Sequence, residues 1–256
     1  MEEHPENSVR RSRGIYLLPN LFTTAALFSG FYAIVAAMND RFEAAAVAVF
    51  VAMVMDGLDG RVARLTHTQS DFGAEYDSLS DMVAFGLAPA LVVYVWSLSN
   101  LGKMGWLAAF VYTAGTALRL ARFNTQLGTV DKRYFQGLPS PSAAAIVAGM
   151  VWTADNYGFA GAEVSWAALV ITIVTGLLMV SNVRYQSFKD IDFRGKVPFI
   201  VAVVVMLSFV VVFIQPAVVL FLLFFGYAVS GVLLTLIQRR RRRAERRATV
   251  EGDDPH

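Results

Sequence analysis

The chain has 256 residues, of which 56% are hydrophobic and 16% are charged, whereas an ordinary soluble domain is about 45–50% apolar and about 25% charged. These proportions exclude a disordered chain and a coiled coil, and the absence of cysteine excludes disulfides, thiolate metal sites and a cysteine nucleophile. The net charge of +2 conceals a strong asymmetry in where the basic residues lie.

Eight apolar segments follow one another along the chain, most of them close to the roughly 20 residues that a membrane-spanning helix needs. They lie at 16–38, 42–63, 77–98, 104–124, 140–155, 164–182, 197–214 and 216–236. We therefore expect an all-α integral membrane protein with about eight transmembrane helices, the last two forming a hairpin at Pro216. The expected organisation is a basic tail at 1–14, a membrane domain at 15–237 and an Arg-rich tail at 238–256.

Basic residues collect on one side of this predicted membrane domain. Both tails are basic, and most other basic residues lie in or beside the loops after the second, fourth and sixth helices. The opposite loops carry only Arg41 and Lys103. The positive-inside rule then places both termini in the cytoplasm. The run Arg239 to Arg243 is typical of a topology anchor against anionic headgroups, so we expect membrane lipids, and no nucleic acid, as its partners.

A dense polar pattern, D-x2-D-G-x2-A-R-x8-G-x3-D-x3-D, joins the second and third predicted helices over residues 56–81. On the third helix, Asp77 and Asp81 are four residues apart and therefore stack on one face. The short polar connection makes the two helices antiparallel neighbours, so we expect their acidic faces to meet across one cavity. At 100° per residue, one arc of about 140° on the second helix holds Asp56, Asp59, Gly60, Ala63 and Arg64.

These residue types suit phosphoryl chemistry. Four carboxylates without a nearby histidine or cysteine favour hard cations such as Mg²⁺ or Mn²⁺, and four can hold two ions about 3.5–4 Å apart. Gly60 and Gly73 would let a phosphate approach the backbone, and the Arg64 guanidinium could bind that phosphate through two N–H groups. Any one aspartate has an alternative as a turn or cap residue, but the combined pattern inside an apolar block favours a functional site.

The pattern resembles the signature of the CDP-alcohol phosphatidyltransferase family at every motif position, including the eight-residue gap. This resemblance implies a homodimer with a six-helix membrane core, to which two C-terminal helices are added here. The implied ligands of two divalent cations are Asp56, Asp59, Asp77 and Asp81, with Asp81 also the general base. The residues implied to line the site for CDP-diacylglycerol are Gly60, Ala63, Arg64 and Gly73.

Three further stretches, at 18–23, at 119–124 with 134–141, and at 178–189, resemble the branch of this family whose acceptor is L-serine. The serine carboxylate or a donor phosphate would need a cation, and four basic residues near the expected cytoplasmic helix ends are candidates: Arg119, Arg122, Arg184 and Lys189. Membrane topology alone also explains Arg184 and Lys189. Asn20 and Thr23 either bind the nucleotide or cap the first helix.

Two other functions stay open from the sequence. Glycerol 3-phosphate or inositol phosphate could replace serine as acceptor, but each would need a denser cationic pocket. A divalent-cation transporter or channel would spread acidic groups through the depth of the membrane, whereas these cluster at one end. The resemblance further implies a bacterial inner membrane, with the active site facing the cytoplasm.

Overall fold

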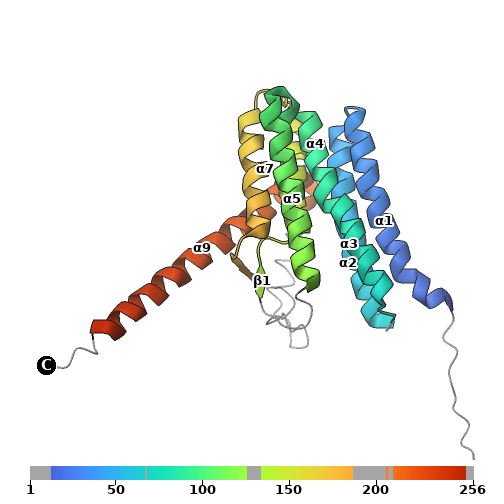
Figure 1. Ribbon diagram of the computed structural model, residues 1–256. Coiled ribbons are helices and arrows are strands. Elements are labelled where there is room, and N and C mark those ends of the chain that lie inside the picture. Colours follow the sequence, from blue (N-terminus) through green and yellow to red (C-terminus); the bar gives the residue numbers. More distant parts are fainter. Residues whose placement is uncertain (1–12, 67, 126–133, 187–205, 207–209, 252–256) are drawn as a thin grey trace, which may run out of the picture.

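The computed structural model describes residues 13–66, 68–125, 134–186, 206 and 210–251, and these form a helical bundle (Figure 1). Its α-helices are α1 (Arg13–Met38), α2 (Phe42–Thr66), α3 (Asp71–Asp81), α4 (Ala88–Trp96), α5 (Lys103–Thr125), α6 (Ser140–Asn156), α7 (Ser165–Val180) and α9 (Pro216–Glu251). Two short elements accompany them: the π-helix η1 (Met82–Leu87) and the 3₁₀-helix η2 (Leu98–Leu101).

The predicted all-helical architecture is confirmed for the described residues with one exception. Strands β1 (Tyr134–Gln136) and β2 (Arg184–Gln186) pair antiparallel in a two-stranded ribbon. This ribbon and the α2–α3 connection lie at the same end of the bundle, the lower end in Figure 1. These strands were not predicted, because a strand of three residues is too short to show an alternating pattern.

Within the described part of the chain, three helical stretches are long and apolar enough to cross a membrane: Leu18–Met38, Asp71–Trp96 and Pro216–Ile237. The α7 helix is apolar but shorter. Most of the seventh predicted segment lies outside the described residues, and the count of eight spans stays a prediction.

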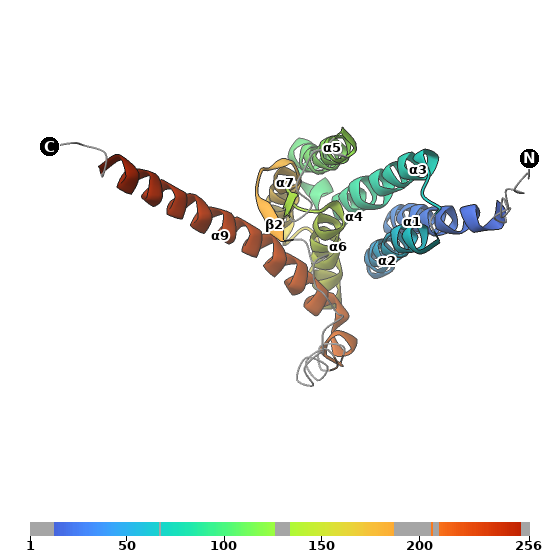
Figure 2. The same ribbon diagram turned by 90° about the horizontal axis from the view of Figure 1, so that it is seen from below.

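Helix α9 begins at Pro216, as the proline predicted, but continues to Glu251 across the boundary predicted at residue 237. Seen from below, it runs past α6 and β2 and extends beyond the bundle (Figure 2).

Helices α1 and α2 lie side by side because small residues line their contact. Ala33, Ala36 and Ala37 of α1 are buried in the same core cluster as Ala45 and Val49 of α2. Small side chains allow two helix backbones to approach closely, which is the usual basis of helix association in a membrane. This contact fixes the position of α2, which carries the first half of the acidic pattern.

The third predicted helix differs from expectation in its start and in its regularity. It begins at Asp71, not near residue 77, because the Ser70 hydroxyl accepts a hydrogen bond from the Gly73 amide (3.0 Å) and caps the helix. After Asp81 the chain passes through η1 before α4 continues to Trp96. The buried Tyr112 hydroxyl of α5 donates to the Phe85 carbonyl within η1 (3.0 Å), which fixes this irregular turn against α5.

Helices α5 and α7 cross at a pair of glycines. A Cβ on Gly176 would lie 2.8 Å from the Tyr112 Cα, and one on Gly115 would lie 2.5 Å from the Gly176 carbonyl oxygen. Backbone atoms cannot move aside as a flexible side chain does. The crossing therefore requires glycine at both positions.

We expect Gly176→Ala to destabilise the bundle by about 1–3 kcal/mol, because the new methyl overpacks the crossing. The matched control is Gly226→Ala on α9, where a Cβ would meet nothing within 4 Å. That control should be neutral or stabilising by up to about 1 kcal/mol, the difference in helix propensity between the two residues. Thermal unfolding of both variants in one detergent tests this, and equal unfolding temperatures would contradict it.

Candidate active site

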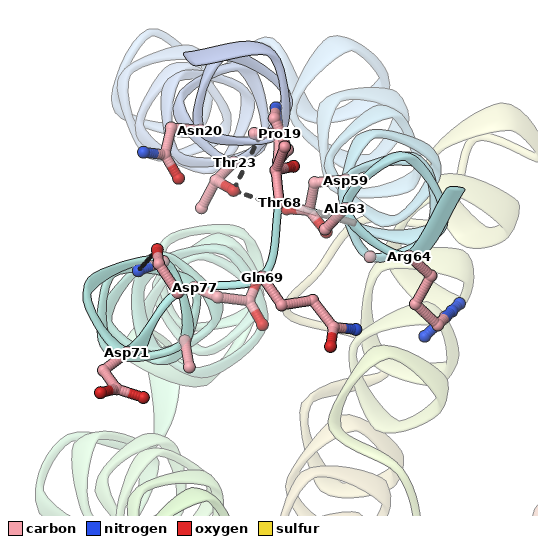
Figure 3. Close-up of a pocket in the computed structure, with 14 residues that line it drawn as sticks. Pro19, Asn20, Thr23, Asp59, Ala63, Arg64, Thr68, Gln69, Asp71 and Asp77 are labelled. Atoms are coloured by element: carbon pink, nitrogen blue, oxygen red, sulfur yellow. Dashed lines mark hydrogen bonds between the residues drawn. The ribbon is translucent and has the colours of Figure 1, made fainter. Parts of the chain in front are cut away.

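A pocket of about 450 Å³ lies between the ends of α1, α2 and α3, beside the α2–α3 connection (Figure 3). Eight of the residues predicted to form a site line it: Asn20, Thr23, Asp59, Gly60, Ala63, Arg64, Gly73 and Asp77. The two halves of the acidic pattern therefore face one cavity, as their helical spacing indicated.

Three carboxylates converge beside this pocket, and two of them, Asp59 and Asp77, line it. Asp56 and Asp59 of α2 and Asp77 of α3 each offer one oxygen, and the three oxygens lie within 4.8 Å of one another. Asp59 is 5% exposed. Figure 3 shows Asp59 and Asp77 on opposite walls of the pocket. The acidic faces of α2 and α3 therefore meet, as the helical spacing predicted.

The fourth aspartate, Asp81, lies one helical turn beyond Asp77, at the junction of α3 and η1. Its carboxyl group is beside that of Asp56, and the Arg119 guanidinium is close enough to interact electrostatically with both. The acidic cluster thus continues from the pocket toward α5, where a buried cation offsets part of its charge.

Helix α1 holds the two acidic helices in register. The Thr23 hydroxyl donates to Asp59 Oδ2 (2.8 Å), and the Thr23 carbonyl accepts from the Ser80 hydroxyl of α3 (3.0 Å). A second link joins the Thr24 and Tyr76 hydroxyls (2.9 Å). Because α1 begins at Arg13, Thr23 and Asn20 lie inside the helix, and neither caps its start.

The donor set fits a divalent cation. All the converging groups are carboxylates, the ligands that Mg²⁺ and Mn²⁺ prefer. Asp77 Oδ1 is buried and has no hydrogen-bond partner among the described residues. A buried carboxylate oxygen without a donor is costly, and a bound cation would both satisfy it and offset the repulsion among its neighbours.

The two motif glycines do different things locally. A Cβ at Gly60 would have only Arg64 Nη1 nearby, at 3.8 Å, so this position opens onto the cavity. A Cβ at Gly73 would lie 3.1 Å from the Ser70 hydroxyl oxygen and 3.5 Å from Asn20 Oδ1, so this position makes room for the helix cap. Arg64 is exposed at the rim and points away from the acidic groups (Figure 3).

The four predicted basic residues have different surroundings. Arg119 Nη1 donates to the Ser140 hydroxyl (2.6 Å) beside the acidic cluster. Arg122 instead donates to Gln136 Oε1 (2.6 Å) at the end of β1 and to Asn182 Oδ1 (2.8 Å), two residues before β2, and so joins the last turn of α5 to the ribbon. Arg184 lies in β2, and its side chain is outside the described part. Lys189 lies outside the described residues altogether.

Six residues that line the pocket were not predicted as site residues. Two of them, Pro19 and Ala74, lie in α1 and α3, and the other four lie in or next to the α2–α3 connection: Thr68, Gln69, Ser70 and Asp71. Their sequence signal was only a polar linker of defined length. The serine three residues before a motif glycine was a cap signal that could have placed the start of α3 correctly.

Comparison with known proteins agrees with the acidic pattern. A family model described as CDP-alcohol phosphatidyltransferase matches residues 16–180. A CDP-diacylglycerol–serine O-phosphatidyltransferase of Helicobacter pylori is 38% identical over 219 residues, covering 86% of this chain and 91% of that protein. Proteins of the same name from Mycobacterium leprae (34%, covering 72% of this chain and 62% of that protein) and Methanocaldococcus jannaschii (37%, covering 56% and 63%) are also similar.

We expect the purified protein to bind Mn²⁺, and Asp77→Asn to weaken that binding by about tenfold or more, as removal of a charged ligand should. The matched control is Glu75→Gln, which removes an exposed carboxylate from the same helix. Titration of Mn²⁺ followed by electron paramagnetic resonance measures both affinities. If the two variants lost affinity equally, the acidic cluster would not be the binding site.

Proposed function

Because the chain belongs to the CDP-alcohol phosphatidyltransferase family, we propose that it transfers the phosphatidyl group of CDP-diacylglycerol to the hydroxyl of L-serine. The products are phosphatidylserine and CMP. The observation that carries this proposal is the convergence of Asp56, Asp59 and Asp77 beside a pocket that Asp59 and Asp77 line, within the segment that the family model matches. The serine acceptor is supported by the names of the similar proteins.

In this proposal the donor's CDP group occupies the pocket between α1, α2 and α3, with its acyl chains in the membrane. Gly60 and Ala63 leave room beside the cavity, and the exposed Arg64 at the rim would approach the pyrophosphate. Asn20, Thr23 and Gly73 complete this surface. The same residues have no comparable use in a cation channel, which needs no nucleotide site.

The four aspartates would hold two divalent cations, Mg²⁺ or Mn²⁺. When bound, these ions would neutralise the pyrophosphate and stabilise charge developing on the phosphoryl oxygens. Asp81 takes the proton of the serine hydroxyl as general base. The serine oxygen forms a bond to the phosphorus that bears diacylglycerol, the bond from that phosphorus to the bridging oxygen of CMP breaks, and CMP leaves with that oxygen.

Serine is a zwitterion, so its carboxylate needs a cation near the general base. Arg119 meets this need best, since it lies beside Asp81 and its Nε is buried without a hydrogen-bond partner among the described residues. Arg122 is engaged by Gln136 and Asn182, which suits a supporting role at the edge of the site. Arg184 and Lys189 remain candidates for binding serine or a donor phosphate.

We place the site at the cytoplasmic face of a bacterial inner membrane. The basic residues of the tails and of the even-numbered loops support this orientation. The proposal keeps eight spans with both termini in the cytoplasm, and a homodimer as the family resemblance implies. The tails at 1–14 and 238–256 flank the catalytic membrane domain.

An acceptor panel tests the reaction. With CDP-diacylglycerol and Mn²⁺, purified protein should release CMP when serine is added, and much less with glycerol 3-phosphate or inositol phosphate, whose phosphates lack a sufficiently cationic pocket. Two quantities are measured for each acceptor: the CMP that is released, and the transfer of the labelled acceptor into lipid. A preference for either phosphorylated alcohol would contradict the serine assignment, and Mn²⁺ flux into vesicles without CMP release would favour a transporter.

We expect Asp81→Asn to lower kcat by about 10²–10⁴-fold, the usual contribution of a general base, while leaving the protein folded. Turnover at saturating Mn²⁺ separates loss of the base from weakened cation binding. Circular dichroism and thermal unfolding serve as the folding control. Wild-type turnover in this variant would remove Asp81 from the mechanism.

A further inference from the structure

The π-helix η1 follows directly on Asp81, and the sequence shows why the helix widens there. Pro89 lies in the first turn of α4 and has no amide hydrogen. In a regular α-helix its ring would collide with the carbonyl of the residue four positions earlier, which is Phe85. In η1 the backbone bonds across five residues instead, since the Ala88 amide donates to the Val83 carbonyl. The wider turn makes room for the proline.

The Phe85 carbonyl receives its hydrogen bond from another helix. Because Pro89 has no N–H, this carbonyl lacks the donor that an α-helix would give it. The Tyr112 hydroxyl of α5 donates to it at 3.0 Å. Phe85 and Tyr112 are both fully buried, so bulk water does not reach this bond. A buried carbonyl without a partner is costly, and Tyr112 therefore stabilises η1 in its widened form.

Close backbone contacts hold η1 between α1 and α5. A Cβ on Gly30 of α1 would lie 2.6 Å from the Ala84 Cα. A Cβ on Gly86 would lie 3.2 Å from Thr116 Cγ2 of α5. With this packing on both sides, η1 has little space in which to shift, and its path depends on the hydrogen bond that shapes it.

Asp81 lies between two fixed points of the chain. One residue earlier, the buried Ser80 hydroxyl donates to the Thr23 carbonyl of α1 (3.0 Å), and one residue later η1 begins. A helix rotates by about 100° per residue, so a change in the path of η1 turns the Asp81 side chain relative to Asp77. The direction of the Asp81 carboxylate is therefore tied to the shape of η1.

We propose that Tyr112 is a positioning residue for the reaction, which fixes η1 and thereby the direction of the Asp81 carboxylate relative to Asp77. This inference rests on the proposed function, in which Asp81 is the general base and a cation ligand. Tyr112 does not line the donor pocket, so it acts through η1. A misplacement of a reacting group by about 1 Å can cost about 100-fold in rate, so a distant hydrogen bond of this kind matters to catalysis.

The test is Tyr112→Phe, which removes one hydroxyl and keeps the buried ring. We expect kcat with CDP-diacylglycerol and serine to fall about 10- to 100-fold. The KM for CDP-diacylglycerol should stay within about twofold, since no residue of η1 lines the pocket. The electron paramagnetic resonance spectrum of bound Mn²⁺ should also change, because Asp81 is one of its proposed ligands. An unchanged kcat or an unchanged Mn²⁺ spectrum would overturn the inference and leave Tyr112 a purely structural role.

Ser97→Ala is the matched control. The Ser97 hydroxyl is also buried and donates to a backbone carbonyl in another part of the chain, that of Gly161 (2.6 Å). Ser97 follows the last residue of α4, at the far end of that helix from η1. We expect a lowered unfolding temperature, with kcat within about twofold of wild type and an unchanged Mn²⁺ spectrum. An equal fall in kcat would mean that any lost buried hydrogen bond has this effect, and would overturn the assignment to Tyr112.

A double-mutant cycle with Pro89→Ala tests why Tyr112 is needed. The new alanine supplies an amide to the Phe85 carbonyl, so Tyr112→Phe should lower the unfolding temperature by less than about half as much in this background as in the wild type. Equal lowering in both backgrounds would overturn the inference, because η1 would then not depend on this bond. The unfolding cycle and the Mn²⁺ spectrum need no acceptor. Failure of the wild-type protein to release CMP with serine would instead overturn the proposed function.

Discussion

Mutual repulsion among the carboxylates of α2 and α3 is the constraint that the rest of this structure must satisfy. At an effective dielectric constant of 20, two unit charges 4 Å apart repel by about 4 kcal/mol, and three oxygens here lie within 4.8 Å. The protein resists this force by anchoring both helices to α1, since Thr23 contacts Asp59 through its hydroxyl and Ser80 through its carbonyl. Among the described residues, Arg119 is the cation that interacts electrostatically with Asp56 and Asp81, and its single charge offsets only part of the negative charge of the cluster.

Helix α5 carries the cation of this arrangement, Arg119, and its contacts fix where that cation lies. Helix α5 supports η1 through Tyr112, carries Arg119 two turns further on, and has Arg122 in its last turn, which bonds to Gln136 and Asn182. One helix therefore supports the turn after Asp81, supplies the neighbouring charge and attaches to the ribbon through Gln136. The glycine crossing with α7 lies between Tyr112 and Arg119, and it sets the distance of α5 from its neighbour.

Much of this fold could be predicted from apolar segment lengths. The helices expected at 16–38, 42–63, 104–124 and 140–155 appear within three residues of those limits, because polar residues bound each apolar run. The start of α3 was wrong by six residues, since its first turns are polar and are held by the Ser70 cap and by contacts with α1. For the site, helical spacing predicted the opposing aspartates. It could not separate Arg119 from Arg122, because their different partners, Ser140 and Gln136, come from tertiary packing.

The π-helix after Asp81 also limits how this gene product can change in length. A π-helical turn accommodates one residue more than an α-helical turn. The carboxylate face of α3 can therefore face the pocket while the buried face of α4 faces the core only if η1 keeps all six of its residues. Since an α-helix rotates by about 100° per residue, a single deletion there would turn one face away from its partner. Insertions and deletions in this apolar stretch should therefore be selected against more strongly than substitutions that preserve its volume.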